Sequence, residues 1–430
     1  MATVALCNLG CSKNQIDGLQ ILEQLRLAGH ELTEDFAMAD IIAVNTCAFI
    51  EAAKIEAIDK ILELARYKTS GRCKQLIVCG CFSERYRQIA GRQLPEVDFW
   101  VGVNDWPKLI AQHFHTHSEP SFVRVLQPPR ASQYLKIAEG CSHACAYCAI
   151  PGIRGNYKSR TIDAVIEEAS WLFDQGVKEC ILVSQDTSFY GRDRSSSLTR
   201  LLEAMLKRTG FPWIRMMYLH PAFVDDQLLR LVAAEPRLCR YFDIPLQHGA
   251  DAILKAMNRR PLSKGIRTLV EGIRTAMPDA AIRTSFIVGF PGETRRLFEE
   301  LLSFVKELRF DKAGVFPFSP EEGTPAFSMR PAPRPATSTR RCEMVMSLQR
   351  EISESINASK IGRMIEVIID EAAEESESHG FPWEGRTQWD APEVDGKVYV
   401  KGSGLQAGDI VTVLIQNANE YDLFGEVQPN

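Results

Sequence analysis

The sequence has no uninterrupted apolar run of the roughly 18 residues that a membrane-spanning helix needs, so no transmembrane segment is expected. The stretch from Met1 to Asp17 has neither the basic region nor the small-residue cleavage site of a secretory signal. The chain also has no internal repeat and no low-complexity tract. With 430 residues of ordinary globular composition, these absences predict a cytoplasmic protein of about two to four domains that is not bound to a membrane.

Twelve cysteines are present, and without an export signal they favour metal or redox chemistry over disulfides. Cys141, Cys145 and Cys148 are spaced C-x3-C-x2-C, and no other cysteine follows within thirty residues. A four-iron cluster has four ligand positions, so three thiolates leave one iron open to an outside ligand. A structural zinc site would need a fourth ligand, and His143 lies too close in sequence to supply it easily. The spacing therefore predicts a [4Fe–4S] cluster with one open iron.

The charge of the chain is unevenly distributed. The net charge is −5, but residues Ile361–Asn430 contain 14 acidic and four basic side chains, a net charge of −10. The remaining residues therefore carry +5. A shift of this size predicts a separate C-terminal module with its own partner preference.

Apolar runs alternate with helical patterns in the first 118 residues. The expected strands are Thr3–Leu9, Asp40–Asn45 and Gln75–Cys79, and the expected helices between them include Leu19–Leu27 and Ala52–Ala65. Repeated βαβ units predict an open parallel α/β domain over residues 1–118. The proline-bearing segment Thr116–Arg130 is expected to be a linker.

Strand–helix alternation resumes in residues 127–358. The expected strands are Gln133–Ala138, Glu179–Val183, Ile214–Leu219, Tyr241–Pro245, Ala281–Val288 and Lys312–Phe318, and the helices include Ile162–Gln175, Ser197–Arg208 and Arg340–Ser359. Six such units predict a partial (β/α)6 barrel, whose chemistry would gather at the strand carboxyl ends. In residues 361–430, the short runs Met364–Ile369, Gly396–Val400 and Asp409–Ile415 predict a small antiparallel β-barrel.

A second set of cysteines follows the expected N-terminal strands. Cys11, Cys47 and Cys81 each lie just past a strand, at separations of 36 and 34 residues. Loops after parallel strands converge on one edge of the sheet, so these thiols could hold a second cluster with an open iron. The alternative is that they are ordinary core or loop residues.

Several sequence motifs resemble one enzyme family. Gly140–Cys148 is similar to the cluster loop of radical S-adenosylmethionine enzymes, and the segments Leu9–Asn14, Asn45–Ile50 and Gly80–Tyr86 resemble the signature of the methylthiotransferase family. The tail resembles a TRAM domain, so the resemblance covers nearly the whole chain. Two departures, Ser12 where proline is common and Gly18 where serine is common, do not involve a predicted ligand.

The resemblance implies two [4Fe–4S] clusters and S-adenosylmethionine as cofactors. One electron from the Cys141–Cys145–Cys148 cluster would cleave S-adenosylmethionine into methionine and a deoxyadenosyl radical, which takes hydrogen from the substrate carbon. Sulfur would come from the second cluster and the methyl group from a second S-adenosylmethionine, with methylation preceding insertion.

The resemblance also suggests residues around S-adenosylmethionine. They are Tyr147, Gln185, Asp186, Gly289, Gly292 and Glu293. Simpler alternatives exist for all of them except Gln185: core packing for Tyr147, a helix N-cap for Asp186, and a plain turn for Gly289–Glu293. Arg154, Lys158 and Arg160 form a basic stretch after the cluster loop. Such runs are usually solvated surface, but here an acidic substrate group would have to approach nearby.

Two branches of the methylthiotransferase family are compatible with these motifs. Gln185–Thr187, Asp243–His248, Glu321–Thr324 and Asp390–Gly396 resemble the branch that modifies the β-carbon of an aspartate in a basic small-subunit ribosomal protein of the decoding centre. The alternatives are a tRNA adenosine methylthiotransferase and a non-catalytic iron–sulfur electron carrier or regulator. The implied partners are the ribosomal protein, an electron donor such as a flavodoxin-type protein, and a sulfur donor.

Overall fold

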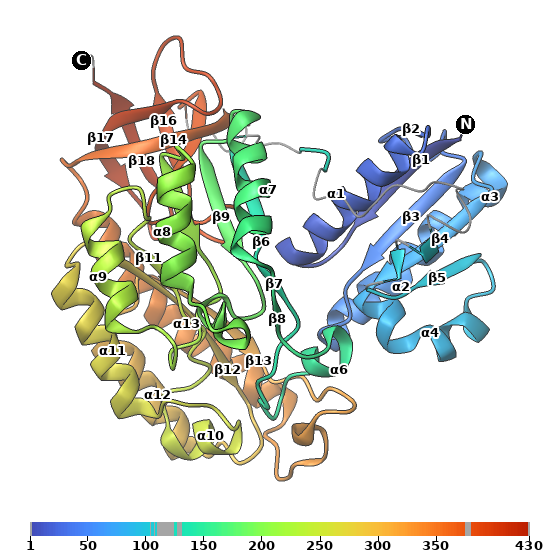
Figure 1. Ribbon diagram of the computed structural model, residues 1–430. Helices are drawn as coiled ribbons and strands as arrows, with labels where there is room; N and C mark the ends of the chain where they lie inside the picture. The colour runs from blue at the N-terminus through green and yellow to red at the C-terminus, as the bar shows by residue number, and fades with distance from the viewer. Residues whose placement is uncertain are drawn as a thin grey trace. The chain divides into compact units, whose positions relative to one another are not determined.

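The computed structural model describes residues 2–103, 105–106, 108–109, 124–126, 131–374 and 380–428. The chain forms two compact units (Figure 1). Unit 1 contains Met1–Gln127, Glu139–Lys158 and Ser319–Phe327, and unit 2 contains Pro128–Ala138, Ser159–Phe318 and Ser328–Asn430. Most of the expected linker, Thr116–Arg130, lies outside the described residues.

Unit 1 is built on a five-stranded parallel sheet with the strand order β2-β1-β3-β4-β5. The strands are β1 (Thr3–Asn8), β2 (Glu31–Leu32), β3 (Ile41–Thr46), β4 (Gln75–Gly80) and β5 (Phe99–Val101). The three strands expected in this region are confirmed as β1, β3 and β4, within one residue at each end. The sequence did not indicate β2 and β5, because runs of two or three residues carry no recognisable pattern.

Helices cover both faces of this sheet. They are α1 (Ser12–Leu27), α2 (Glu51–Ala65), α3 (Tyr67–Ser70) and α4 (Cys81–Gln93). The short α6 (Ile150–Arg154) of the same unit contacts α4. Successive residues of β3 face opposite sides, so Val44 shares a core cluster with Ile61 of α2 and Phe82 of α4, whereas Ala43 shares one with Leu25 of α1. Burial on both faces explains why the central strands are continuous apolar runs.

Helix α1 begins seven residues before the expected start at Leu19. Its first turn carries Ser12, Lys13 and Asn14, which are polar and nevertheless buried. An apolar pattern cannot reveal such a turn, because the buried side chains are not apolar.

Unit 2 contains the six expected parallel strands, in two three-stranded sheets ordered β10-β9-β6 and β11-β12-β13. They are β6 (Ser132–Lys136), β9 (Glu179–Val183), β10 (Trp213–Met216), β11 (Tyr241–Asp243), β12 (Ala281–Val288) and β13 (Lys312–Pro317). An isolated parallel bridge between Ile214 and Leu238 links the two halves. A separate two-stranded pair is formed by β7 (Ala138–Glu139) and β8 (Lys158–Ser159).

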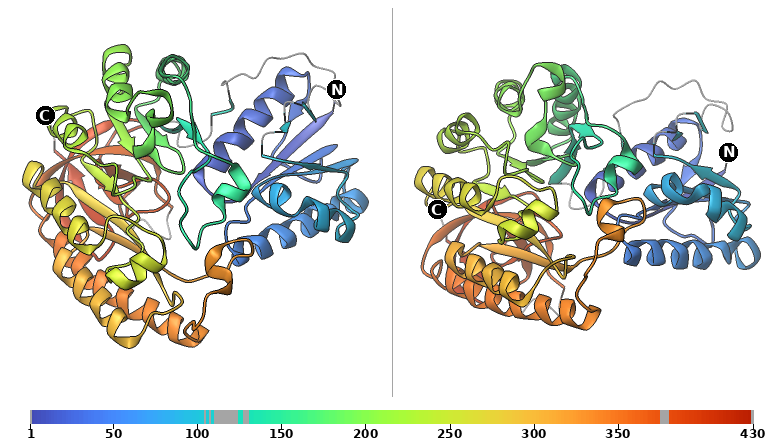
Figure 2. Two further views of the ribbon diagram at one scale, coloured as in Figure 1. Left: turned by 60° about the horizontal axis from the view of Figure 1, so that its bottom comes forward. Right: turned by 90° about the horizontal axis from the view of Figure 1, so that it is seen from below.

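Helices line the outside of these strands (Figure 2). They are α7 (Ile162–Asp174), α8 (Leu198–Arg208), α9 (Asp226–Ala234), α10 (Asp251–Ala256), α11 (Ser263–Ala276) and α12 (Arg295–Leu308). The 3-10 turns η1 (Thr187–Phe189) and η2 (Arg192–Arg194) also lie in unit 2, whereas most of η3 (Pro325–Ser328) belongs to unit 1. In α12, Leu297, Leu301 and Leu308 are buried on one face, and the Thr294 hydroxyl caps the first turn by accepting from the Leu297 N–H.

A 24-residue helix, α13 (Pro335–Ala358), follows the six strands. It starts five residues earlier than the expected Arg340–Ser359. Pro335 occupies the first turn, where a missing N–H costs nothing because that group has no partner inside the helix. The proline-rich run is therefore the start of the helix as well as the end of the preceding loop.

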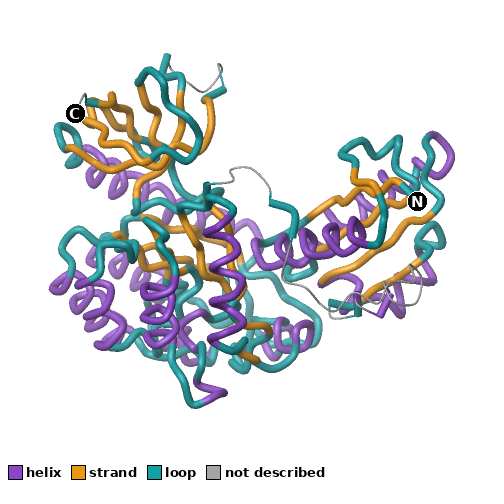
Figure 3. Tube along the Cα trace, turned by 45° about the horizontal axis from the view of Figure 1, so that its top comes forward, coloured by secondary structure: helices purple, strands orange, loops and turns teal. Residues whose placement is uncertain are grey.

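The C-terminal strands form a closed barrel ordered β14-β15-β16-β18-β17 (Figure 3). They are β14 (Met364–Ala372), β15 (Trp383–Thr387), β16 (Val398–Lys401), β17 (Ile410–Ala418) and β18 (Leu423–Val427). The expected barrel is confirmed. One correction concerns strand direction: β16 and β18 pair in parallel, while the other four neighbouring pairs are antiparallel.

A buried ionic network joins this barrel to β9 and β10 inside unit 2. Arg386 of β15 contacts Asp370 at 2.7 Å and Glu179 of β9 at 2.9 Å, and Arg215 of β10 contacts the other oxygen of Glu179 at 2.6 Å. Both arginines and Glu179 are almost completely buried. These ion pairs therefore hold the C-terminal barrel against β9 and β10.

The net charge of −10 in residues 361–430 is more negative than the charge that this region exposes on its surface. Four of its acidic side chains are buried and paired with cations: Asp370 with Arg386, Glu384 with Lys397, Asp390 with Lys312, and Asp395 with Arg283. Two of these cations lie outside the tail. Other acids, such as Glu366 and Glu371 of β14 and Glu426 of β18, are exposed.

Within the described ranges, no helix is both long enough and apolar enough to cross a membrane.

Candidate functional site

The Cys11, Cys47 and Cys81 set lies at the carboxyl ends of three neighbouring strands. Cys11 follows β1 and precedes α1, Cys47 follows β3, and Cys81 is the first residue of α4 after β4. Since β1, β3 and β4 are adjacent in the sheet, the three cysteines share one edge of it. The structure thus brings together the residues that sequence spacing had grouped.

Two glycines allow the backbone of these loops to come close together. At Gly10, with φ +93°, a side-chain carbon would lie 2.8 Å from the Cβ of Cys47. At Gly80, with φ +85°, it would lie 2.5 Å from the Asn45 side-chain oxygen and 2.6 Å from the Thr46 carbonyl. Both positions need glycine for conformation and for space.

Replacing Gly80 with alanine should destabilise unit 1 by about 2–5 kcal/mol, because backbone strain and overpacking both act there. The matched control is Gly29→Ala, which has a similar φ of +85° but no atom within 4 Å of the added carbon. The control should cost only about 1–2 kcal/mol, from the backbone conformation alone. Urea unfolding of both variants measures the difference, and equal losses would show that crowding at Gly80 has no effect.

The electrostatics of the three thiols show that they converge. Burial raises the pKa of Cys47 to about 11, and charge on Cys81 and Cys11 adds to this rise. Burial also raises the pKa of Cys81, against the lowering effect of Arg154. At Cys11, surrounding protein atoms oppose ionisation, but Lys13, Arg154 and backbone N–H groups outweigh them and lower its pKa. Three converging thiolates repel one another, so bound iron would relieve that repulsion.

Arg154, the last residue of α6, is a cation that acts on all three of these thiols. Its side chain is 1% exposed and forms ion pairs with Asp17 at 3.1 Å and Glu139 at 3.0 Å. Arg154 therefore differs from the usual member of such a basic stretch, which lies on the solvated surface. A single cationic residue just after a cysteine motif gives no sequence signal of burial, since its partner Asp17 is 137 residues away.

The Cys141, Cys145 and Cys148 set lies in the loop between β7 and α6, in the same unit. The Cys141 N–H donates to the Gly155 carbonyl at 3.0 Å, and the Cys148 N–H donates to the Cys145 carbonyl at 3.1 Å. Cys141 and Cys145 are buried. Tyr147, expected near the adenine, is half-buried in this loop. The backbone hydrogen bonds fix the three cysteines on a compact loop.

A distant segment, Ser319–Phe327, completes unit 1. The Ala326 N–H donates to the Ala146 carbonyl inside the cysteine loop at 2.8 Å. Glu321 accepts from the Glu51 N–H at 2.9 Å and pairs with Arg85 at 3.0 Å. The segment therefore contacts both the cysteine loop and the helices of the parallel sheet, although sequence reasoning used it only as a branch motif.

The other candidate residues lie at strand carboxyl ends in unit 2. Gln185 and Asp186 follow β9, and the Asp186 carboxylate accepts from the Ser188 hydroxyl at 2.6 Å and from the Phe189 N–H at 3.2 Å. This is the capping alternative, here at the start of η1. The Asp186 carboxylate thus shapes the turn after β9.

Gly289, Gly292 and Glu293 follow β12. One carboxylate oxygen of Glu293 accepts from the N–H groups of Gly289 and Phe290, and the other pairs with Arg341 at 3.2 Å. The Glu293 side chain is completely buried. Its carboxylate therefore stabilises the Gly289–Glu293 loop by accepting hydrogen bonds from the loop's own backbone.

Two further residues at this end have strained backbones. Tyr218 after β10 has φ +60° and Gln247 after β11 has φ +74°, and neither is glycine. The Tyr218 N–H donates to Asp243 at 3.0 Å, and the Gln247 N–H donates to the Ser285 carbonyl at 2.8 Å. Such strain gathers at functional sites. No sequence pattern reveals it, although Gln247 belongs to one of the family-like motifs.

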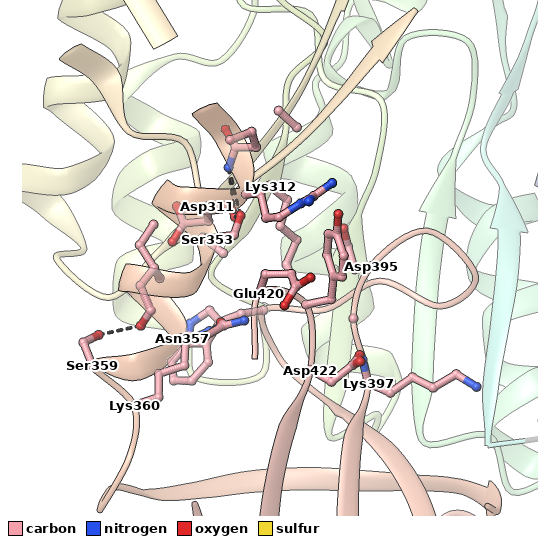
Figure 4. Close-up of a pocket in the computed structure, with 18 of the residues that line it drawn as sticks. Asp311, Lys312, Ser353, Asn357, Ser359, Lys360, Asp395, Lys397, Glu420 and Asp422 are labelled. Atoms are coloured by element: carbon pink, nitrogen blue, oxygen red, sulfur yellow. Dashed lines mark hydrogen bonds between the residues drawn. The ribbon is translucent and has the colours of Figure 1, made fainter. Parts of the chain in front are cut away.

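A cavity of about 740 Å³ in unit 2 lies apart from every candidate residue. It is lined by the amino-terminal ends of β12 and β13, by α13 and by loops of the C-terminal barrel, with Asp311, Lys312, Lys360, Asp395 and Asp422 among its residues (Figure 4). Barrel chemistry gathers at the opposite, carboxyl ends of strands. We therefore assign the site to the cysteines and strand carboxyl ends and not to this cavity.

The cysteine sets fit iron–sulfur clusters better than single metal ions. Among the described residues, no group of three His, Cys, Asp or Glu side chains is arranged to hold one metal ion. A four-iron cluster takes one thiolate on each iron, so its cysteines need not meet at one point. All twelve cysteines are outside disulfides. Closely packed loops, converging thiols and a buried cation suit a cluster with three protein ligands.

Family models match three successive parts of the chain. They are the uncharacterized protein family UPF0004 at residues 3–102, the Radical SAM superfamily at residues 135–305, and the TRAM domain at residues 361–427.

Full-length relatives carry one common name. "Ribosomal protein uS12 methylthiotransferase RimO" of Desulforamulus reducens is 42% identical over 99% of this chain and 100% of that protein. The protein of the same name from Aquifex aeolicus is 44% identical over 98% of this chain and 96% of that protein.

Solved structures share the fold at low identity. The radical S-adenosylmethionine methyltransferase TsrM from Kitasatospora setae has a TM-score of 0.55 at 14% identity, covering 86% of this chain and 79% of that one. The cobalamin-dependent radical enzyme OxsB has a TM-score of 0.52 at 14% identity, covering 83% and 56%.

Proposed function

The chain belongs to the ribosomal protein uS12 methylthiotransferase family, and from that membership we propose that it attaches a methylthio group to the β-carbon of an aspartate in uS12. The proposal rests on 42% identity to a protein named as a uS12 methylthiotransferase over 99% of this chain. The presence of two three-cysteine sets in one compact unit supports it. The tRNA adenosine alternative is not favoured, because these relatives are named for a ribosomal protein. Family membership also makes the chain an enzyme rather than an electron carrier.

Each cysteine set would hold one [4Fe–4S] cluster: Cys141, Cys145 and Cys148 the first, and Cys11, Cys47 and Cys81 the second. When bound, the clusters and S-adenosylmethionine supply the one-electron chemistry, the sulfur and the methyl group, since a side-chain base cannot readily remove hydrogen from such a carbon. The protein binds these groups, orients them and limits water around them.

The residues at the strand carboxyl ends of unit 2 would position S-adenosylmethionine. They are Gln185, Asp186, Gly289, Gly292 and Glu293, and Tyr147 of the cysteine loop in unit 1 completes the proposed set. Asp186 and Glu293 act through the backbone, because their carboxylates already hold the turns after β9 and β12. The Gly289–Gly292 turn would then present backbone groups to the cofactor.

The proposed partners follow from charge and chemistry. Exposed Glu366, Glu371 and Glu426 on the C-terminal barrel would attract a basic ribosomal protein and repel phosphate. A flavodoxin-type protein would supply electrons, and a separate donor would supply sulfur. A ribosomal substrate and such partners support a cytoplasmic location.

The proposal is tested by mass spectrometry of ribosomal proteins and tRNA from cells with and without the gene. We expect uS12 to gain the mass of one methylthio group replacing one hydrogen, on an aspartate, only when the gene is present. A gene-dependent methylthio-adenosine in tRNA with unchanged uS12 would overturn the proposal. Purified enzyme with uS12 or tRNA at matched salt repeats the comparison directly.

A further inference from the structure

We propose that Arg154 is the positioning residue of the Cys11–Cys47–Cys81 centre, where its buried guanidinium supplies a fixed positive charge to the cluster and to an anionic sulfur species on the open iron. The inference rests on the proposed function, because it takes these cysteines as cluster ligands. It assigns a role to a residue that belongs to neither cysteine motif.

The side chain of Arg154 lies beside the loops that carry the three cysteines. The Arg154 side chain donates to the Asn14 side-chain oxygen at 3.1 Å, and its charge opposes the rise in the pKa of the Cys81 thiol. Asn14 in turn donates to the Leu9 carbonyl at 2.7 Å and the Thr46 carbonyl at 3.3 Å, in the loops that carry Cys11 and Cys47. One guanidinium is thus tied to the loops that hold all three thiols.

The positive charge of Arg154 is screened by solvent less than the charges of its acidic partners. Asp17 and Glu139 fix the guanidinium, but they are 15% and 21% exposed, so solvent screens part of their charge, whereas Arg154 is 1% exposed. At the Cys81 sulfur the effect of Arg154 is larger than the opposing effect of Asp17. Three thiolates and a bound anionic sulfur make the centre negative, so a fixed buried cation stabilises it.

A fixed cation should also set the reduction potential. Cluster potentials depend on net charge, hydrogen bonds to sulfur and exposure to solvent. Reduction adds negative charge, so loss of the Arg154 charge should make the cluster harder to reduce. Arg154 is also connected to the other cysteine loop, because Glu139 accepts from the Gly140 N–H at 3.1 Å as well as from Arg154.

The experiment uses the full chain with Cys141, Cys145 and Cys148 replaced by alanine, so that the remaining iron belongs to the second centre. Arg154→Gln, Arg154→Lys and the control Arg160→Gln are reconstituted in this background, and iron content and midpoint potential are measured. Arg160 also pairs with a buried carboxylate, Glu168, but lies in unit 2. Arg154→Gln should disfavour reduction at least tenfold, about 59 mV for one electron. Arg154→Lys and Arg160→Gln should stay near the parent.

The outcomes separate this inference from the proposed function. If the parent background binds no iron, the assignment of these cysteines as cluster ligands fails. If the parent binds iron and Arg154→Gln keeps its potential, the inference about Arg154 fails alone. If both Arg154 variants lose the cluster, the residue is only structural and the inference is overturned. Loss of iron in Arg154→Gln with retention in Arg154→Lys supports the charge role.

Discussion

Replacing Cys145 with alanine should abolish cleavage of S-adenosylmethionine to deoxyadenosine, whereas Cys47→Ala should leave this cleavage measurable and stop methylthio formation. The reason is that the two sets follow different elements: Cys145 lies in the β7–α6 loop and Cys47 after β3. The open iron that would bind the methionine group belongs to the first set, and the open iron that would hold sulfur belongs to the second.

Deoxyadenosine and methylthio product are measured by chromatography, and iron by chemical assay. The reconstituted chain should hold about eight irons, and alanine at Cys141, Cys145 and Cys148 should leave about four. Cys342→Ala, a partly buried thiol of α13 outside both sets, should change neither product nor iron. Loss of deoxyadenosine in a folded Cys47→Ala protein that keeps the first cluster would contradict this division.

Replacing Arg386 with alanine should destabilise unit 2 by about 3–5 kcal/mol, because it leaves the buried carboxylates of Glu179 and Asp370 with less positive charge. The control is Arg267→Ala, since Arg267 forms a two-bond ion pair with Glu307 on the surface of the same unit. The control should cost about 0–1 kcal/mol, because exposed pairs are screened by solvent. Urea unfolding of both variants tests this, and similar losses would show that burial of the network does not matter.

Acid should weaken the same network. Although burial alone would raise the pKa of Glu179, Arg215 and Arg386 outweigh it and lower the pKa from its ordinary value of 4.5 to about 2. A lowered folded-state pKa means that Glu179 contributes stability above pH 4.5 and loses it progressively as the pH falls toward 2. Arg386→Ala should reduce this pH dependence.

Because of this network, the role of the acidic tail in binding the ribosomal protein cannot be tested by deleting the tail. Deleting Ile361–Asn430 would remove Arg386 and leave Glu179 with one buried cation instead of two, so lost binding could reflect unfolding. Replacing the exposed Glu366, Glu371 and Glu426 with glutamine changes the outer charge and leaves the network intact.

Elements with a clear apolar period were predictable from the sequence. β9 and β12 were expected with the bounds that the structure shows, and β1, β3 and β4 within one residue. The edge shared by Cys11, Cys47 and Cys81 was predictable because βα loops of a parallel sheet always end on the same side. Spacing along the chain was enough for this inference.

Features that depend on distant partners were not predictable. The burial of Arg154 needs Asp17, and the burial of Arg386 needs Glu179, at separations that no local pattern spans. Likewise β2 and β5 exist because neighbouring strands pair with them and not because of their own sequence. The burial of these two arginines could therefore not be inferred from the sequence.

The inclusion of Ser319–Phe327 in unit 1 has a consequence for synthesis on the ribosome. Glu321 contacts Arg85 and Glu51 across 236 and 270 residues, so these bonds form only after most of the chain has been translated. At about 5–20 residues per second, roughly 10–50 s separate the synthesis of Arg85 from that of Glu321. During that interval Glu51 of α2 and Arg85 of α4 lack the partner that holds them in the finished fold, so unit 1 is completed only late in synthesis.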